Sequence, residues 1–330
     1  MPNSPQEWSL TLQGIIKPSA ERKRLATVLG LSDMTLLRWA SGESNPQRPH
    51  LIRLVHALQP QHRDEILGQL EKVYPEIHSW LKSNANESIT SEFFAQVMHV
   101  RTTTTEHLRF WRISDMVLKQ ALLQLDPNIS GLSVKLIRCM PPRGGKVRSI
   151  RECAGKGTPP WNNDLEHDVL FLGMESMSGY TTESRRFVND GNLHKGKMIP
   201  AYPGEYEVSA IAQPIQFKGH IAGCLLAASV QEDYFTQQRV LLMENFANLI
   251  SLAFDNKDFY QPALVELRFM PQPRIQKPFI ATFRDRVTRR VHEAAHKGLR
   301  VNNAAVELAV WQEIEGELLA LPDDGGDPYQ

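Results

Sequence analysis

The sequence lacks net charge and long apolar runs and has few cysteines, and each shortage excludes a class of protein. The three cysteines, Cys139, Cys153 and Cys224, are too few and too far apart for a disulfide framework or a zinc site. Basic and acidic residues both number 37, so any face that binds nucleic acid must be local. No apolar run approaches the roughly 20 residues that span a bilayer, and the start lacks a signal-peptide core. We therefore expect a cytoplasmic protein that has no membrane partner.

Sequence patterns of common enzyme classes are also missing. There is no P-loop, no Gly-X-Ser-X-Gly elbow and no Rossmann glycine pattern. His292, Glu293 and His296 match the short HExxH pattern of zinc hydrolases, in which the histidines bind zinc and the glutamate acts as base. No third ligand lies nearby, and the upstream "RDRVTRR" is typical of an exposed helix. We expect no enzymatic activity and no metal site, with a zinc hydrolase as the less favoured alternative; the sequence names no cofactor.

Length and periodicity predict an α+β protein of several domains. A chain of 330 residues exceeds one ordinary core, and 42% hydrophobic with 22% charged residues is typical of globular protein. Residues 1–82 form the first predicted domain, an all-α bundle whose apolar spacing indicates helices at 6–16, 20–29, 33–41, 48–58 and 62–81. The small polar stretch "SNANES" at 83–88 is typical of a linker.

Residues 89–255 form the second predicted domain, which contains an antiparallel sheet. Helices are expected at 90–101, 107–125 and 236–254, and strands at 131–140, 147–154, 207–217 and 220–230, with an irregular connection over 155–205. Residues 256–330 form a third part, a C-terminal helical extension: a proline-punctuated segment, helices at about 280–297 and 303–320, and an acidic tail that we expect to be disordered. The apolar stripes of these two helices must be buried, either within the chain or against a second subunit.

The stretch "LATVLGLSDMTLLRWASG", residues 25–42, predicts two helices joined by a tight turn. Gly30 tolerates the positive φ that ends a helix sharply, and Ser32 is placed to cap the next helix with its hydroxyl. Leu36 and Trp39 have the spacing of a buried face, whereas Met34 fits either the core or the surface. The pattern is that of a helix-turn-helix.

The ordered set LAxxLGLSxxTLxRWxxGxxxP, followed by LxRLxxAL, resembles the XRE or phage-repressor type of helix-turn-helix from Glu21 to about Leu58. The resemblance implies a five-helix domain that binds double-stranded DNA, usually as a dimer on a palindromic site. The alternative is a signalling or defence protein that uses the same fold for protein contacts.

The helix that begins after Ser32 would enter the major groove with its first turn. The candidate DNA-binding residues are Ser32, Asp33, Met34, Thr35, Leu37, Arg38, Ser44, Asn45 and Arg48. Asp33 departs from expectation, because an acid is repelled by phosphate and accepts only from cytosine. Arg22, Lys23 and Arg24 form a charge run of the kind that usually marks a solvated face.

The block from 89 to 255 resembles a GAF domain, most clearly in "VSAIAQPIQFKGHIAGCLLAASVQEDYFTQQRVLLMENFANLISLAF". The resemblance implies a small-molecule sensor with a pocket between the sheet and the long connection. A long loop is usually functional, and aromatics with arginines suit a planar or anionic ligand. The candidate ligand-binding residues are Trp161, Tyr180, Arg185, Arg186, Phe187 and Tyr202. The alternative is that the aromatics pack this segment onto the sheet while the arginines remain solvated.

Together these patterns predict a one-component transcription regulator that forms a homodimer or a higher oligomer and responds to an unidentified small-molecule effector. Redox sensing through a cysteine pair is disfavoured, because hairpin register places Cys139 opposite about residue 149 rather than Cys153.

Overall fold

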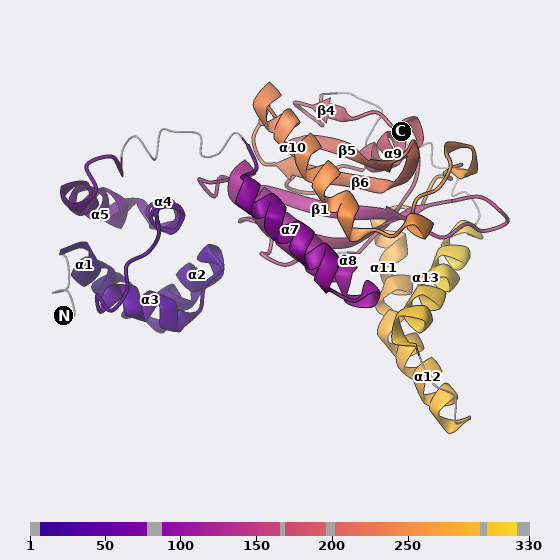
Figure 1. Cartoon of the computed structure of the whole chain (residues 1–330), viewed down its shortest axis with the longest axis horizontal. Helices are drawn as coiled ribbons and strands as arrows, with labels where there is room; N and C mark the ends of the chain where they lie inside the picture. The colour runs from indigo at the N-terminus through magenta and orange to yellow at the C-terminus, as the bar shows by residue number, and fades with distance from the viewer. Residues whose placement is uncertain (1–6, 78–87, 166–168, 196–201, 298–301, 322–330) are drawn as a thin grey trace. The chain divides into compact units, whose positions relative to one another are not determined.

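The computed structural model describes residues 7–77, 88–165, 169–195, 202–297 and 302–321. The chain divides into two compact units (Figure 1). The first comprises residues 1–88 with 122–132 and 157–163, and the second comprises 89–121, 133–156 and 164–330. The fold is α+β with an antiparallel sheet and a C-terminal helical region, as predicted. In the described ranges, no helix is both long and apolar enough to cross a membrane.

The first unit contains a bundle of short helices, α1 (Glu7–Ile15), α2 (Ser19–Leu29), α3 (Asp33–Ala40), α4 (Arg48–Ala57) and α5 (Pro60–Val73). Trp8, Leu25, Leu36 and Leu54 belong to its fully buried core. The five predicted helices are confirmed, but the last one is shorter than expected. It ends at Val73 because Pro75 disfavours helical dihedrals at the preceding residue.

The second unit is organised around a six-stranded sheet of order β3-β2-β1-β6-β5-β4. The strands are β1 (Leu132–Cys139), β2 (Ile150–Gly157), β3 (Phe171–Leu172), β4 (Val188–Asp190), β5 (Ser209–Phe217) and β6 (His220–Ser229). Lys218 and Gly219 form the tight turn between β5 and β6, both with positive φ. β2 is buried along its whole length although it carries charged residues.

Among the described residues, the second unit also contains four helices before its C-terminal region. They are α7 (Ser91–Thr103), α8 (Glu106–Leu125, whose last turn belongs to the first unit), α9 (Met177–Ser184) and α10 (Gln237–Ile250). Both α9 and α10 contact β5 and β6. The irregular connection predicted over 155–205 is wrong in part, because β3, α9 and β4 lie within it. Two- and three-residue strands and a Ser/Thr-rich helix carry too little apolar periodicity for detection.

In the part of the C-terminal region that the structure describes, three α-helices follow short 3₁₀ turns at Ser251–Ala253, Asn256–Asp258 and Pro262–Leu264. They are α11 (Pro273–Ala281), α12 (Phe283–His296) and α13 (Asn303–Leu319). The helix predicted at about 280–297 corresponds to α12, but α11 lies where a proline-punctuated extended segment was predicted, and Thr282 separates the two helices. Phe283 stacks on Trp311 at 3.9 Å between ring centroids, and Trp311 shares a core with Phe171 of β3. The apolar stripe of α13 is buried, whereas Phe283 and Val287 of α12 pack against this core and stay half-buried.

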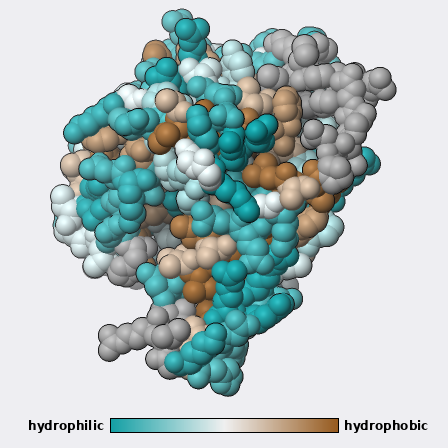
Figure 2. Space-filling view, turned by 90° about the vertical axis from the view of Figure 1, so that its right-hand side faces the viewer, coloured by the Kyte–Doolittle hydropathy of each residue, from teal (hydrophilic) through white to brown (hydrophobic). Residues whose placement is uncertain are grey.

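The second unit continues from the sheet into these helices without a division at residue 255. In Figure 2 the lower projection, where α12 lies, is mostly hydrophilic, and apolar surface appears above it in small separate areas. The expected linker at 83–88, apart from Ser88, and the expected tail at 322–330 lie outside the described residues.

Candidate functional site

The turn between α2 and α3 has the predicted geometry. Gly30 is left-handed at φ 66°, and its N–H closes the last turn of α2. Ser32 is the N-cap of α3, and its hydroxyl accepts a hydrogen bond from the N–H of Thr35 at 3.2 Å. Leu36 and Trp39 are buried, as expected, and anchor α3 in the bundle. One face of α3 is therefore fixed, which leaves the opposite face for contact.

The exposed face of α3 carries several of the predicted DNA-binding residues. Met34 is 64% exposed and Leu37 is 40% exposed, so Met34 belongs to the surface rather than to the core. Arg38 is also exposed and lies 3.8 Å from Glu43 in a loose ion pair. Thr35 is half-buried. Of the remaining candidates, Ser32, Asn45 and Arg48 are exposed, and Ser44 and Asp33 are half-buried.

Asp33, the first residue of α3, forms an ion pair with an arginine of the neighbouring helix. Its carboxylate accepts a hydrogen bond from Arg22 Nε of α2 at 3.3 Å, so the two helices are joined by an ion pair. Arg24 is likewise bound to Glu21 at 2.6 Å and to the carbonyl of Ala57 at 2.9 Å. The interpretation of Arg22 and Arg24 as a merely solvated face is corrected, because both hold the bundle together. The contacts of Arg22 with Asp33 and of Arg24 with Ala57 depend on helix packing, which the sequence does not reveal, whereas Arg24 and Glu21 form a local pair within α2.

A second group of polar residues is buried in the sheet, and no sequence pattern predicted it. Lys135 Nζ on β1 lies 3.0 Å from Glu152 Oε1 on β2, with side chains 15% and 8% exposed. Burial raises the pKa of the Cys224 thiol on β6 to about 12, and the nearby Glu152 carboxylate adds to the rise. Cys224 donates to the carbonyl of Ser178 on α9 at 3.7 Å. The ion pair, the thiol and α9 are therefore neighbours.

The predicted ligand-binding residues fall into different parts of the chain. Tyr180 on α9, and Arg185, Arg186 and Phe187 directly after it, are all exposed, whereas Tyr202 is half-buried. Trp161 belongs to the first compact unit. Arg185 ends α9 in the left-handed conformation, at φ 58°.

All three cysteines are buried and free. Burial raises the pKa of the thiols of Cys139 and Cys153. Because the thiolate is the reactive form, none of the three is activated in this conformation. Met140 donates its N–H to the carbonyl of Ser149, close to the predicted hairpin register.

The HExxH residues lie on α12, where His292, Glu293 and His296 are exposed. Within the described residues, no three histidine, cysteine, aspartate or glutamate side chains come together as a metal site.

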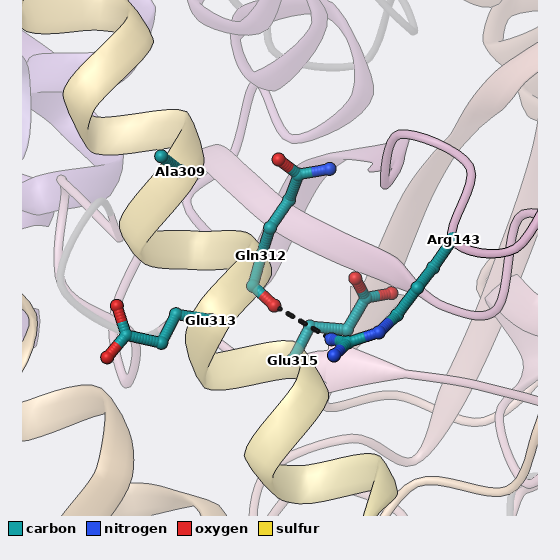
Figure 3. A pocket seen from close by; sticks show the side chains of 5 residues that line it. All are labelled: Arg143, Ala309, Gln312, Glu313 and Glu315. Carbon is teal, nitrogen blue, oxygen red and sulfur yellow. Dashed lines mark hydrogen bonds between the residues drawn. The ribbon is translucent and has the colours of Figure 1, made fainter.

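A hollow of about 320 Å³ lies between α13 and the turn that joins β1 to β2. Arg143, Ala309, Gln312, Glu313 and Glu315 line it (Figure 3). Arg143 donates to the carbonyl of Gln312 at 3.3 Å, and Ser149 Oγ donates to Glu315 Oε1 at 2.6 Å. Burial raises the pKa of the Glu315 carboxyl to about 7, although Arg143 opposes the shift.

Comparison with known proteins finds GAF-like folds among the solved structures. No family profile matches the chain, and no curated protein does. Among solved structures, the free methionine-R-sulfoxide reductase of Thermoplasma acidophilum is 13% identical, with 46% of this chain and 98% of that chain covered and a TM-score of 0.35. A GAF domain of the Acinetobacter phosphoenolpyruvate-protein phosphotransferase is 14% identical, with 50% of this chain and 93% of that chain covered and a TM-score of 0.34. The free methionine-R-sulfoxide reductase of Neisseria meningitidis is 14% identical, with 64% of this chain and 92% of that chain covered and a TM-score of 0.33.

These structures have GAF-like folds, and the chain resembles them over about half of its length. The expectation of no enzymatic activity is corrected by the same comparison, because two of the three structures are enzymes. Catalytic side chains are brought together by tertiary structure, so missing sequence motifs do not exclude catalysis on such a fold. The XRE resemblance has no counterpart among these structures.

Proposed function

We propose that the chain is a DNA-binding transcription regulator whose GAF-like domain senses a small molecule. The observation that carries the proposal is α3, a capped helix that is anchored by Leu36 and Trp39 and presents Met34, Leu37 and Arg38 outward. A helix held in this way can lie in a major groove, with its first turn toward base edges. Because Arg22 neutralises Asp33, the acid adds less repulsion toward phosphates than its sequence position implies.

The roles of the exposed residues follow from their chemistry. Arg38 can donate to phosphate or to guanine, and Leu37 can contact thymine methyl groups. Ser44 and Asn45, just after α3, and Arg48, at the start of α4, can donate to the backbone phosphates. In a symmetric dimer, the two α3 helices would have to be about 34 Å apart to reach successive major grooves.

The first test uses DNA selected from a random duplex library by the full-length protein. We expect an enriched sequence, and we expect Arg38→Ala to weaken binding to it by about 1–3 kcal/mol, because one side-chain contact is lost. Thr35→Ala should act in the same direction. Arg289→Ala, on the exposed face of α12, is the matched control and should bind normally.

A library from which no sequence is enriched would count against the proposal. It would favour the alternative, protein contacts through the exposed apolar Met34 and Leu37. Enrichment that Arg38→Ala and Thr35→Ala leave unchanged would remove α3 from the interface.

We place the effector site beside the buried pair of Lys135 and Glu152. A buried ion pair is costly to form, and replacing it with apolar residues often stabilises a protein. The presence of such a costly pair in the sheet, near Cys224 and Ser178 of α9, favours a binding role. A small-molecule fraction of cell extract should change affinity for the selected DNA, and Lys135→Met should abolish that change while the affinity without extract persists. An effect of extract that Lys135→Met leaves intact would move the effector site elsewhere.

A further inference from the structure

Exposed aromatic and basic residues gather where α9 ends and where β5 turns into β6. We call this set the aromatic–basic patch; it comprises Tyr180, Arg185, Arg186, Phe187, Phe217 and Lys218. The aromatic members Tyr180, Phe187 and Phe217 are 43%, 54% and 42% exposed, although large apolar side chains are usually covered. Arg185, Arg186 and Lys218 are exposed as well.

Tertiary structure joins the two halves of the patch, which are about thirty residues apart in sequence. The side chain of Gln216 donates from Nε2 to the carbonyl of Arg185 at 2.9 Å. Helix α9 also packs against β5 and β6. On the other side, Val188, next to Phe187, pairs with Ala212 of β5. The end of α9 and the end of β5 therefore form one continuous surface.

Two of the basic residues of the patch have an unusual backbone conformation. Arg185 and Lys218 adopt positive φ, at 58° and 50°, which residues other than glycine seldom do. Both positions carry a cation where glycine would be less strained, and such outliers cluster at functional sites. Both cations are exposed, and each lies within two residues of an exposed phenylalanine, Phe187 or Phe217.

The charge of the patch is uncompensated. Arg185, Arg186 and Lys218 make no ion pair with any described residue, although Lys218 Nζ lies 5.1 Å from the ring centre of Phe217. The only acid in the two segments 180–189 and 213–221 is Glu183, which is half-buried. Burial raises the pKa of its carboxyl, which accepts a backbone hydrogen bond from Leu267, and the nearby charge of Glu266 adds to the rise. Glu266 is itself paired with Lys146 and Arg148, so the three exposed cations of the patch have one half-buried acid in their own segments.

Exposed rings interspersed with cations fit unpaired bases on a phosphate backbone. Every base has a flat face that stacks on an aromatic ring, and cations beside the rings bind the phosphates. A duplex hides its base faces, and an acidic peptide would use the cations but leave the three rings unused. We propose that the aromatic–basic patch binds single-stranded nucleic acid, with Tyr180, Phe187 and Phe217 stacking on bases and the three cations contacting phosphates.

The proposal is independent of DNA binding by α3, and it is tested with the full chain. Binding of fluorescent 12-nucleotide oligothymidine and oligouridine is measured by anisotropy over a range of salt concentrations. The two probes distinguish DNA from RNA. We expect binding to at least one, and a loss of about tenfold in Phe187→Ala, since each stacked base is worth about that factor. Phe187→Trp should retain affinity and Phe187→Leu should lose it, which separates stacking from mere apolar contact.

The charge contribution is tested by the double variant Arg185→Gln/Arg186→Gln. The slope of log affinity against log salt should become shallower by about one to two, because each phosphate contact releases counterions. Arg289→Gln, an exposed arginine on α12, is the matched control and should leave the slope unchanged.

Three results would overturn the proposal: no binding of either oligonucleotide, affinity equal in the wild type and Phe187→Ala, or a polyglutamate peptide that binds as tightly as the oligonucleotides. None of these results bears on α3, because the patch variants should keep full affinity for duplex DNA selected by the protein. Loss of duplex binding in the α3 variants, in turn, should leave oligothymidine binding unchanged.

Discussion

Glu315 holds a buried carboxyl group between α13 and the turn that joins β1 to β2. Ser149 donates to one carboxyl oxygen, and the other has no hydrogen-bond partner in the described part of the chain. Arg143 reaches across Gly316, where a Cβ atom would overlap its Nη1. Glycine at 316 therefore admits the arginine.

The pKa of Glu315 makes stability depend on pH in a specific direction. Its value is raised from 4.5 to about 7, so between these values the folded state keeps a proton that the unfolded state has lost. Stability should therefore fall as the pH rises from about 4.5 to 7, by up to about 3 kcal/mol. Glu315→Gln keeps an acceptor for Ser149 and should remove this dependence, as measured by urea unfolding at pH 5 and pH 8.

Glu317, two residues further along α13, serves as a control because its pKa is shifted in the opposite direction. Its hydrogen bonds with Arg286 lower its pKa, so its contribution is present at neutral pH and is lost in acid. Glu317→Gln should therefore destabilise at pH 8 and matter less near pH 4. A Glu315→Gln variant with the wild-type pH profile would show that the carboxyl is not protonated in the folded protein.

At the scale of elements, α3 shows how a single residue starts a helix. The Ser32 hydroxyl accepts a hydrogen bond from the N–H of Thr35 in the first turn, and the same N–H also donates to the carbonyl of Ser32 at 3.0 Å. Ser32→Ala should cost about 1 kcal/mol of unfolding free energy, measured by urea titration, whereas Ser32→Asn should restore most of it, because asparagine also caps well. Equal stability of Ser32→Ala and the wild type would mean that the cap contributes nothing.

Elements with strong local signals were predicted well, and elements without them were not. The helices before and after Gly30 match within a residue or two, because a left-handed glycine and a serine cap act on their own neighbours. β3, α9 and β4 were missed, because pairing with distant strands stabilises them. Val188, for example, pairs with Ala212, far along the chain. The strand predicted at 147–154 begins three residues before β2 does in the structure, because the charged residues of β2 interrupt the apolar pattern that would mark its ends.

At the scale of the whole molecule, α7 leaves most of its surface uncovered. Val97 is its one buried residue, whereas Phe94 and Met98 are exposed one turn apart. Leu108 and Trp111 of α8 are exposed too. Exposed apolar side chains gathered on helices are typical of interfaces between proteins. We propose that α7 and α8 form the homodimer contact that a palindromic DNA site requires.

Charges on α7 should break this dimer. We expect sedimentation velocity to show a dimer for the wild type and a monomer for Phe94→Glu/Met98→Glu, because dimerisation would bury two carboxylates without partners. Gln96→Glu adds charge to the same helix outside this pair and should stay dimeric. A monomeric wild type, or a double variant that still dimerises, would contradict the proposal.

Some features of the candidate sites are formed by local interactions and others by contacts between distant parts of the chain. The exposed face of α3 followed from sequence, because helical periodicity decides which side of a short helix faces the core. The sequence also determined the α+β class and the β5–β6 hairpin, through local turn and alternation signals. Only the tertiary structure decided that Asp33 meets Arg22, that Gln216 meets Arg185, and that Glu315 lies against Ser149. Those neighbours depend on how whole elements pack, which local patterns do not encode.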